Sequence, residues 1–203
     1  MGKLENRKSS QNKINLVFLD WGSDFMELIT EIYEEYIGHI KLDSEELYKV
    51  RKASRAVLFN SLSQIALPFV SKNMYHKLPG GGIEKDESII EALNREIMEE
   101  VGAKIDIISE IGAIIEYRDK FNQLQISYCY LAKVNEIVDS PSFTKDELFA
   151  GFELKWMDFE DAIATIENDK PNDYMGRFIQ KRDLAFLTKT KEIIRKYDMK
   201  TLI

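Results

Sequence analysis

The sequence predicts an α/β protein in which helices cover both faces of a mixed β-sheet. Short apolar runs bounded by polar turns recur between residues 56 and 157, as expected for strands. Amphipathic segments, with apolar residues at three- and four-residue steps, lie between and after these runs, as expected for helices that pack on a sheet. Together these patterns predict an α/β/α layered sandwich.

Residues 1–52 are expected to form a mostly helical N-terminal extension. Residues 1–12 are polar and are expected to be frayed, and residues 15–19 have the pattern of a short strand. Residues 24–37 have the pattern of an amphipathic helix, and a second short helix is predicted for residues 44–52. The first 50 residues carry six Lys or Arg against ten acids, which disfavours a DNA-binding role.

Residues 53–203 are expected to form the main domain. Its sheet begins with an apolar hairpin that leads into a glycine-rich turn, and a helix follows that turn. Asp158 is expected to cap the short helix that follows the last strand. The other predicted elements are strands at residues 56–59, 65–70, 105–116, 124–134 and 152–157, a short helix at 158–166, and a terminal helix at 174–197.

The helix after the glycine-rich turn has defined start and stop signals. Ser88 followed by Glu91 is a capping box, so the helix is predicted to begin near Ser88. Gly102 is predicted to end it. Its core-facing stripe is expected to consist of Ile90, Leu93, Ile97 and Val101.

This helix carries a concentrated set of acids. Glu96, Glu99 and Glu100 stand at i, i+3 and i+4, so their carboxylates converge on one side. Three such charges would repel one another, and Mg²⁺ suits them because it takes a few carboxylates, water and phosphate oxygens. Arg95 is turned by about 100° from Glu96 and can orient a carboxylate such as Glu87 or Glu100.

Three consecutive glycines precede the helix. Gly80, Gly81 and Gly82 permit positive φ and a close approach of the backbone to a ligand. We therefore expect the turn to present amides or carbonyls to a bound substrate, with Gly81 and Gly82 among its contacts.

Residues 81–103 resemble the Nudix box, G-x5-E-x7-R-E-U-x-E-E-x-G-U, where U is apolar. A chance match at seven fixed positions is expected in about 10⁻⁶ to 10⁻⁷ of chains of this length. The resemblance is therefore to the Nudix hydrolases, also called MutT-like, and the last position departs mildly because a larger aliphatic residue is usual there. The matching positions are Gly81, Glu87, Arg95, Glu96, Ile97, Glu99, Glu100, Gly102 and Ala103.

The resemblance implies the same α/β/α fold and a metal-dependent pyrophosphohydrolase. It also implies that the carbonyl just before the first box glycine, that of Gly80, reaches the metal. Mg²⁺, or Mn²⁺ in its place, would be held by Glu96, Glu99, Glu100 and Gly80, with Arg95 in a catalytic supporting role. This ion would bridge a diphosphate and activate a water.

The general base is left open between two regions of the chain. Within the box, Glu99 or Glu96 is favoured. Outside the box, Glu147 and Glu153 lie where similar proteins often place a further carboxylate, just before the strand that carries Trp156.

The substrate is expected to be a nucleoside triphosphate, or a nucleoside diphosphate linked to another group. Tyr117 could stack on a base and Arg118 could contact a phosphate, although aromatics on alternating strands are more often core residues. A Nudix-like sensor that binds such a ligand without turnover is the alternative from another class. An isoprenoid diphosphate isomerase is a third, and Cys129 lacks a supporting motif for it.

Composition limits the remaining possibilities. The net charge of −7 disfavours binding of a nucleic-acid polymer, and a late run of Lys and Arg that includes Arg182 is expected to be a solvated helix face. The single cysteine, Cys129, is expected to be a buried strand residue. With no secretory signal or spanning apolar run, we expect a cytoplasmic protein that does not bind membranes and forms a homodimer.

Overall fold

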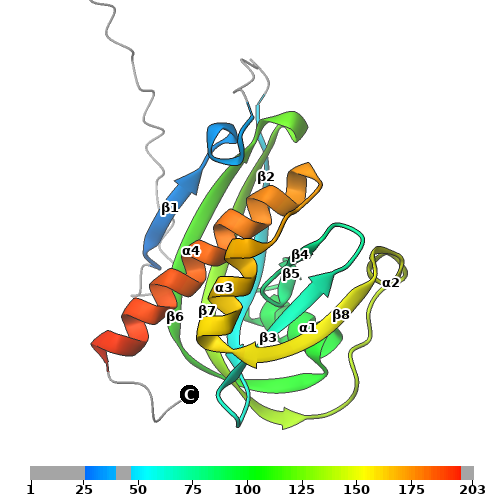
Figure 1. Cartoon of the computed structure of the whole chain (residues 1–203), viewed down its shortest axis with the longest axis vertical. Helices are drawn as coiled ribbons and strands as arrows, with labels where there is room; N and C mark the ends of the chain where they lie inside the picture. Colours follow the sequence, from blue (N-terminus) through cyan, green and yellow to red (C-terminus); the bar gives the residue numbers. More distant parts are fainter. Residues whose placement is uncertain (1–25, 40–46, 198–203) are drawn as a thin grey trace, which may run out of the picture.

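The computed structural model describes residues 26–39 and 47–197 (Figure 1). Within them an eight-stranded sheet has the order β1-β6-β7-β2-β3-β4, with β5 paired to β2 and β8 paired to β3. The strands are β1 (Leu28–Ile32), β2 (Lys49–Phe59), β3 (Gln64–Val70), β4 (Tyr75–His76), β5 (Gly80–Gly82), β6 (Ala103–Arg118), β7 (Gln123–Ile137) and β8 (Phe152–Asp158).

The sheet is mixed, as the sequence predicts. β1 runs parallel to β6 and β2 runs parallel to β7, whereas the other pairs are antiparallel. The predicted hairpin of residues 56–59 and 65–70 is formed by β2 and β3, which meet at Phe59 and Ile65. The long strands predicted at 105–116 and 124–134 are β6 and β7, which extend further at both ends.

Helices cover the two faces of the sheet (Figure 1). Helix α1 (Ile89–Val101) packs on one face, where Leu93 and Ile97 join a core cluster with Leu58 of β2. Helices α3 (Phe159–Asn168) and α4 (Tyr174–Lys196) pack on the other, where Phe178 and Phe186 join a second cluster. The predicted α/β/α sandwich is thus confirmed.

The helix predicted for residues 24–37 is wrong in its described part. Residues 28–32 form β1, and only Glu34–Ile37 form one short 3-10 turn. The β-branched Ile29, Thr30 and Ile32 suit a strand, and β6 offers a free edge with which they pair. Tertiary pairing has overridden the apolar spacing in this segment.

The other N-terminal predictions have mixed outcomes. In the helix predicted for residues 44–52, Lys49 to Lys52 belong to β2, because this stretch pairs along β7 from Lys49 onward. Residues 44–46, and the frayed segment and strand predicted within residues 1–19, lie outside the described residues. The domain boundary between residues 52 and 53 stays a prediction.

The C-terminal half agrees with the prediction except for one element. β8, α3 and α4 occupy the predicted positions, and Asp158 is the N-cap residue of α3, although its side chain makes no capping hydrogen bond. Helix α2 (Lys145–Ala150) was not predicted. Thr144 and Glu147 form a capping box at its start, and this signal could have revealed it.

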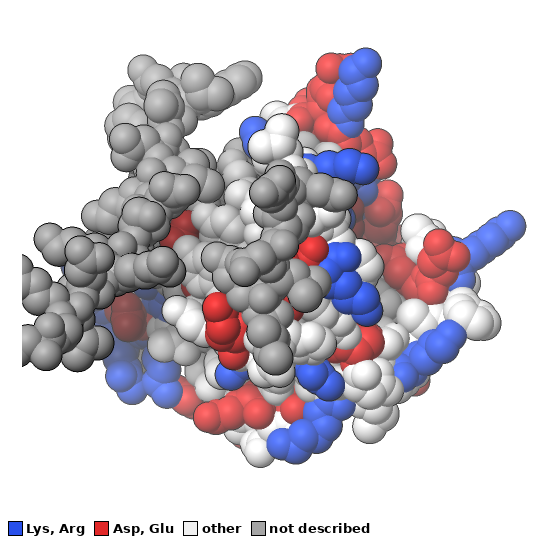
Figure 2. All heavy atoms as spheres, turned by 90° about the horizontal axis from the view of Figure 1, so that it is seen from above, with Lys and Arg blue, Asp and Glu red and all other residues white. Residues whose placement is uncertain are grey.

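The surface carries both signs of charge. Figure 2 shows basic and acidic side chains interspersed on the described part of the face seen from above. Among the described helices, none is long and apolar enough to cross a membrane.

Candidate active site

The glycine-rich turn is fixed to the sheet by β5. Gly80, Gly81 and Gly82 pair with the central strand β2, so the turn is held at a defined place beside the sheet. Gly80 has φ +132, and a Cβ there would lie 2.2 Å from the carbonyl oxygen of Ser54. Only glycine fits this position without displacing the backbone of β2.

Helix α1 leads directly from this turn and has the predicted ends. Ser88 accepts a hydrogen bond from the Glu91 amide at 3.2 Å, and Glu91 accepts one from the Ser88 amide at 2.8 Å. Gly102 closes the helix in the left-handed conformation, with φ 74. The capped helix holds its acidic face in a constant position relative to the glycine turn.

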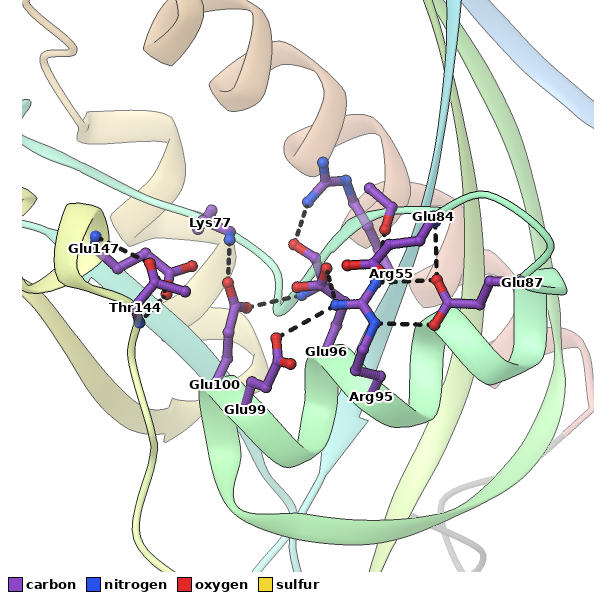
Figure 3. Close-up of polar contacts among 12 residues, drawn as sticks. Arg55, Lys77, Glu84, Glu87, Arg95, Glu96, Glu99, Glu100, Thr144 and Glu147 are labelled. Carbon is purple, nitrogen blue, oxygen red and sulfur yellow. Dashed lines mark hydrogen bonds and ion pairs between the residues drawn. The ribbon is translucent and has the colours of Figure 1, made fainter.

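Arg95 connects Glu87 and two carboxylates of this helix with the turn (Figure 3). Its guanidinium donates to Glu87 at 2.9 and 3.1 Å, to Glu96 at 2.8 Å and to Glu99 at 3.3 Å. It also donates to the carbonyl of Gly82 at 2.9 Å. Hydrogen bonds from Arg95 lower the pKa of Glu87, and those same bonds raise the pKa of Arg95. Arg95 therefore holds these carboxylates against the glycine turn.

Glu96 lies directly over Gly81. A Cβ at Gly81 would be 2.3 Å from Glu96 Oε1 and 2.4 Å from Oε2, so a side chain there would displace the carboxylate. Glu96 is nearly buried, and its Oε1 is held by Arg95. The absence of a side chain at Gly81 leaves the space that the Glu96 carboxylate occupies.

Glu100 is the most buried of the three acids, with 1% of its surface exposed. Its Oε1 accepts from Lys77 Nζ at 2.5 Å, and its Oε2 accepts from the Gly80 amide at 2.8 Å. Burial raises the pKa of Glu100, whereas Lys77 and the Gly80 amide act to lower it. Lys77 therefore supplies the positive charge that this buried carboxylate needs.

Glu99 is the more exposed acid and faces α2. Burial raises its pKa, Arg95 acts against this, and the charges of Glu96 and Glu147 raise it further. Glu147 lies across from the α1 acids, where its Oε2 accepts from the amide and hydroxyl of Thr144 at 2.8 and 2.9 Å (Figure 3). Glu153, the other acid considered as a base, is exposed on β8 and pairs with Lys155.

The residues present fit a divalent cation. Glu96, Glu99 and Glu100 are oxygen donors that crowd one helix face, and the Gly80 carbonyl lies at the turn beside them. Within residues 26–39 and 47–197, no three acidic, His or Cys side chains are already drawn together as a metal cluster. Arg95 and Lys77 instead neutralise the carboxylates, and the Gly80 carbonyl accepts from Arg55 at 3.0 Å.

The two predicted substrate contacts on β6 bond to partners other than the α1 acids. Tyr117 is 8% exposed, stacks on Tyr33 with ring centres 4.7 Å apart, and donates to Glu31 at 3.0 Å. Arg118 is 2% exposed and donates to Glu116 at 3.0 Å. Tyr33 thus covers one face of the Tyr117 ring, and the predicted substrate contacts of both residues stay predictions.

Sequence reasoning missed three cations near the site. Lys77 contacts Glu100, and Arg55 contacts the carbonyl of Gly80. Neither residue lies in a sequence pattern that predicts its contact. Arg182 was expected on a solvated face, which is wrong: it is 0% exposed and pairs with Asp183. It stands four residues from both Phe178 and Phe186, within the buried stripe of α4, and this spacing could have revealed it.

Cys129 has the environment that its strand pattern predicts. It is fully buried on β7, and burial raises the pKa of its thiol. A thiol of this kind stays protonated at neutral pH and is a weak nucleophile.

The fold and the site together define the class of protein. A mixed sheet carries helix α1, which presents three glutamates beside a glycine turn. The chain belongs to the Nudix family, since the NUDIX domain model matches residues 50–178. The N-terminal limit of this match lies at the start of β2 and its C-terminal limit lies in α4.

Known proteins agree with this assignment. Diphosphoinositol polyphosphate phosphohydrolase 3-beta of Bos taurus is 28% identical over 138 residues, which cover 66% of this chain and 79% of that protein. Diphosphoinositol polyphosphate phosphohydrolase 2 of Rattus norvegicus is 27% identical over 124 residues, or 60% of this chain, and the match spans only 65% of the rat protein.

Two solved structures share the fold. A C. elegans Ap4A hydrolase has a TM-score of 0.51 and 20% identity, with 72% of this chain and 98% of that chain covered. The MutT protein from Methanosarcina mazei Go1 has a TM-score of 0.50 and 21% identity, with 73% and 99% covered. At these sequence identities the comparison shows a shared fold and nothing more.

Proposed function

We propose that this protein is a metal-dependent pyrophosphohydrolase that cleaves a phosphoanhydride bond in a nucleoside triphosphate or a nucleoside diphosphate linked to another group. One observation carries the proposal: Glu96, Glu99 and Glu100 are held on one capped helix, directly beside a turn whose Gly81 has no room for a side chain. Relatives named as phosphohydrolases support the same reaction class.

Hydrolysis of a phosphoanhydride depends mainly on positioning and on neutralising charge. Mg²⁺ or Mn²⁺, held by Glu96, Glu99, Glu100 and the Gly80 carbonyl, would polarise the phosphate oxygens and acidify a bound water. Arg95 keeps Glu96 and Glu99 at fixed distances from one another. The amides and carbonyls of the glycine turn would align the substrate.

A carboxylate must take the proton from the attacking water. Glu99 and Glu147 are the best placed, because Glu99 is the least buried of the box acids and Glu147 faces it from α2. Burial and the charges of Glu96 and Glu147 raise the pKa of Glu99 above its usual value, which makes this carboxylate a stronger base. Glu96, which Arg95 holds at 2.8 Å, is better placed to bind the metal than to move a proton.

The alternatives find less support. A sensor that binds without turnover has no need for the complete set of acids, whereas this chain retains all three on the helix. An isoprenoid diphosphate isomerase needs a reactive thiol, and Cys129 is buried with a raised pKa. A cytoplasmic location, a homodimer, and the lack of nucleic-acid and membrane partners stay predictions.

The test is release of phosphate or a nucleotide from a panel of nucleoside triphosphates, dinucleoside polyphosphates, ADP-ribose and nucleotide sugars. Mg²⁺, Mn²⁺ and a chelator are compared for each compound. We expect one class to be cleaved only when metal is present. If a nucleotide raises the melting temperature but nothing is cleaved, the sensor is the better interpretation.

A further inference from the structure

Four arginines gather on the α4 side of the sheet. Arg51 and Arg55 stand four residues apart on β2, and therefore on the same face. Arg51 and Arg118 both donate to Gln125 Oε1, at 2.7 and 3.5 Å. Arg118 comes from β6 and Arg182 from α4. We call these four residues, Arg51, Arg55, Arg118 and Arg182, the arginine cluster.

Two carboxylates tie the cluster together. Glu116 accepts from Arg118 at 3.0 Å and lies 3.7 Å from Arg182. Asp183 accepts from Arg182 at 2.7 Å, and its other oxygen accepts from the Leu78 amide at 2.8 Å. The cluster is therefore joined to the segment that leads into the glycine turn.

The cluster carries more positive than negative charge. Its four guanidinium groups face the two carboxylates Glu116 and Asp183, which leaves two positive charges uncompensated. The negative charge of Glu96 also acts to raise the pKa of Arg51, but Glu96 is already paired with Arg95. Burial lowers the pKa of Arg55 to about 10, and the charge of Arg182 adds to this effect. A negative charge placed near Arg55 would act against this effect, because an opposite charge stabilises the charged form of a buried group.

Several donors in the cluster have no hydrogen-bond partner among the described residues. Arg55, Arg118 and Arg182 are 5%, 2% and 0% exposed. The atoms without a partner are Arg55 Nε, Arg118 Nε and both terminal nitrogens of Arg182, together with Glu116 Oε2. Buried charged donors are normally hydrogen-bonded, so these guanidinium groups carry positive charge that the described side chains do not neutralise through hydrogen bonds; Arg182 Nη1 and Glu116 Oε2 lie 3.7 Å apart as an ion pair.

The cluster touches the candidate active site through the glycine turn. Arg55 donates to the Gly80 carbonyl at 3.0 Å, whereas the Gly80 amide donates to Glu100. A Cβ at Gly82 would lie 2.8 Å from a terminal nitrogen of Arg51. Arg51 is exposed, so the cluster opens to solvent next to the turn.

We propose that the arginine cluster is a subsite for a second phosphate group of the substrate, one that lies outside the anhydride that is cleaved. Arg51 contacts this group, and the buried Arg55, Arg118 and Arg182 supply the uncompensated charge that attracts it. The inference rests on the proposed function. It narrows the substrate class to small molecules with a phosphate in addition to the hydrolysed diphosphate.

The experiment uses binding without turnover. The full chain is titrated with inorganic tripolyphosphate by calorimetry in buffer with EDTA and no metal, which isolates the arginines from the metal site. We expect saturable binding that Arg51→Gln weakens at least about tenfold, because a charge-assisted contact is lost. Arg51→Lys should bind with intermediate affinity, because it keeps the charge but not the planar fork.

The matched control is Lys52→Gln, which removes the same charge from the adjacent, exposed residue whose side chain points to the other sheet face. It should bind tripolyphosphate like the unaltered chain. Arg51 is chosen because it is exposed, whereas a variant of the buried Arg182 could fail to fold.

Three results would overturn the subsite: no binding by the unaltered chain, equal binding by Arg51→Gln, or an equal loss in Lys52→Gln. None of these depends on hydrolysis. If the chain cleaves a substrate but Arg51→Gln binds tripolyphosphate normally, only the subsite is lost. If binding requires Arg51 but no compound is cleaved, the proposed function is lost and the arginine cluster is a phosphate-binding site without a hydrolysed substrate.

Discussion

Lys77 Nζ lies 2.5 Å from Glu100 Oε1, and both side chains are almost completely buried. The ion pair joins the segment before the glycine turn to the end of α1. A buried pair of this kind is expensive to break, because the remaining charge has neither water nor partner. It also implies that a cation bound at Glu100 would share or replace the charge of Lys77.

Lys77→Met should lower the free energy of unfolding by about 3 kcal/mol, because Glu100 keeps its burial and loses its charge partner. Saturating Mg²⁺ should restore part of this loss by supplying positive charge to Glu100. Urea unfolding with and without Mg²⁺ measures both effects. Lys104→Met, which breaks the exposed pair with Glu136, is the control and should cost less than about 1 kcal/mol. Equal losses in the two variants would show that the buried pair has no special weight.

Gly81→Ala should weaken metal binding, because the new Cβ would lie 2.3 Å from the Glu96 carboxylate and force it to move. Gly82→Ala is the matched control, since its Cβ meets only the flexible end of Arg51. The affinity for Mn²⁺, followed by electron paramagnetic resonance, should fall at least about tenfold in the first variant and stay nearly constant in the second. A larger loss of Mn²⁺ affinity in Gly82→Ala than in Gly81→Ala would show that Gly81 is not needed to position the Glu96 carboxylate.

Glu147→Gln should reduce kcat by about 10² to 10⁴ if Glu147 takes the proton from water. Its Mn²⁺ affinity should be unchanged, because this side chain is held by Thr144 rather than by the α1 acids. Glu153→Gln removes an exposed acid of the same type from β8 and should leave kcat as it was. A normal kcat in Glu147→Gln would assign the base to Glu99 or Glu96.

Ser88→Ala should lower the free energy of unfolding by about 1 kcal/mol, because it removes one half of the capping box of α1. Thermal or urea unfolding of the metal-free chain measures this loss. Ser140→Ala is the control and should change little, because the exposed Ser140 bonds to Asp139 through its backbone amide, which the substitution keeps. If Ser88→Ala were as stable as the unaltered chain, the cap would contribute nothing to holding the acidic face.

Local signals in the sequence predicted the box helix well. Its capping box at Ser88, its stop at Gly102 and the side shared by Glu96, Glu99 and Glu100 depend on residues within one or two turns. The same kind of signal predicted the long helix α4 and the hairpin of β2 and β3. These elements agree with the structure because local preference and tertiary packing favour the same conformation.

The failures concern contacts between distant parts of the chain. Residues 28–32 became a strand because β6, more than 80 positions later at Ala113, offers a pairing edge. Lys77 gave no hint of its contact with Glu100 on α1, whereas the burial of Arg182 on α4 could have been predicted from its four-residue spacing to Phe178 and Phe186. Pairing of this kind depends on topology, and local periodicity does not contain it.

Hydrolysis is proposed to depend on a metal ion that the glutamates of α1 hold. The most direct measurement is Mn²⁺ binding to the unaltered chain and to Glu99→Gln and Glu100→Gln, together with turnover of the substrate class found in the panel. We expect both variants to remain folded, to bind Mn²⁺ at least about tenfold more weakly, and to lose turnover by orders of magnitude, because each removes a charged ligand. Near-normal metal affinity and turnover in both variants would show that these glutamates do not hold a metal ion needed for hydrolysis.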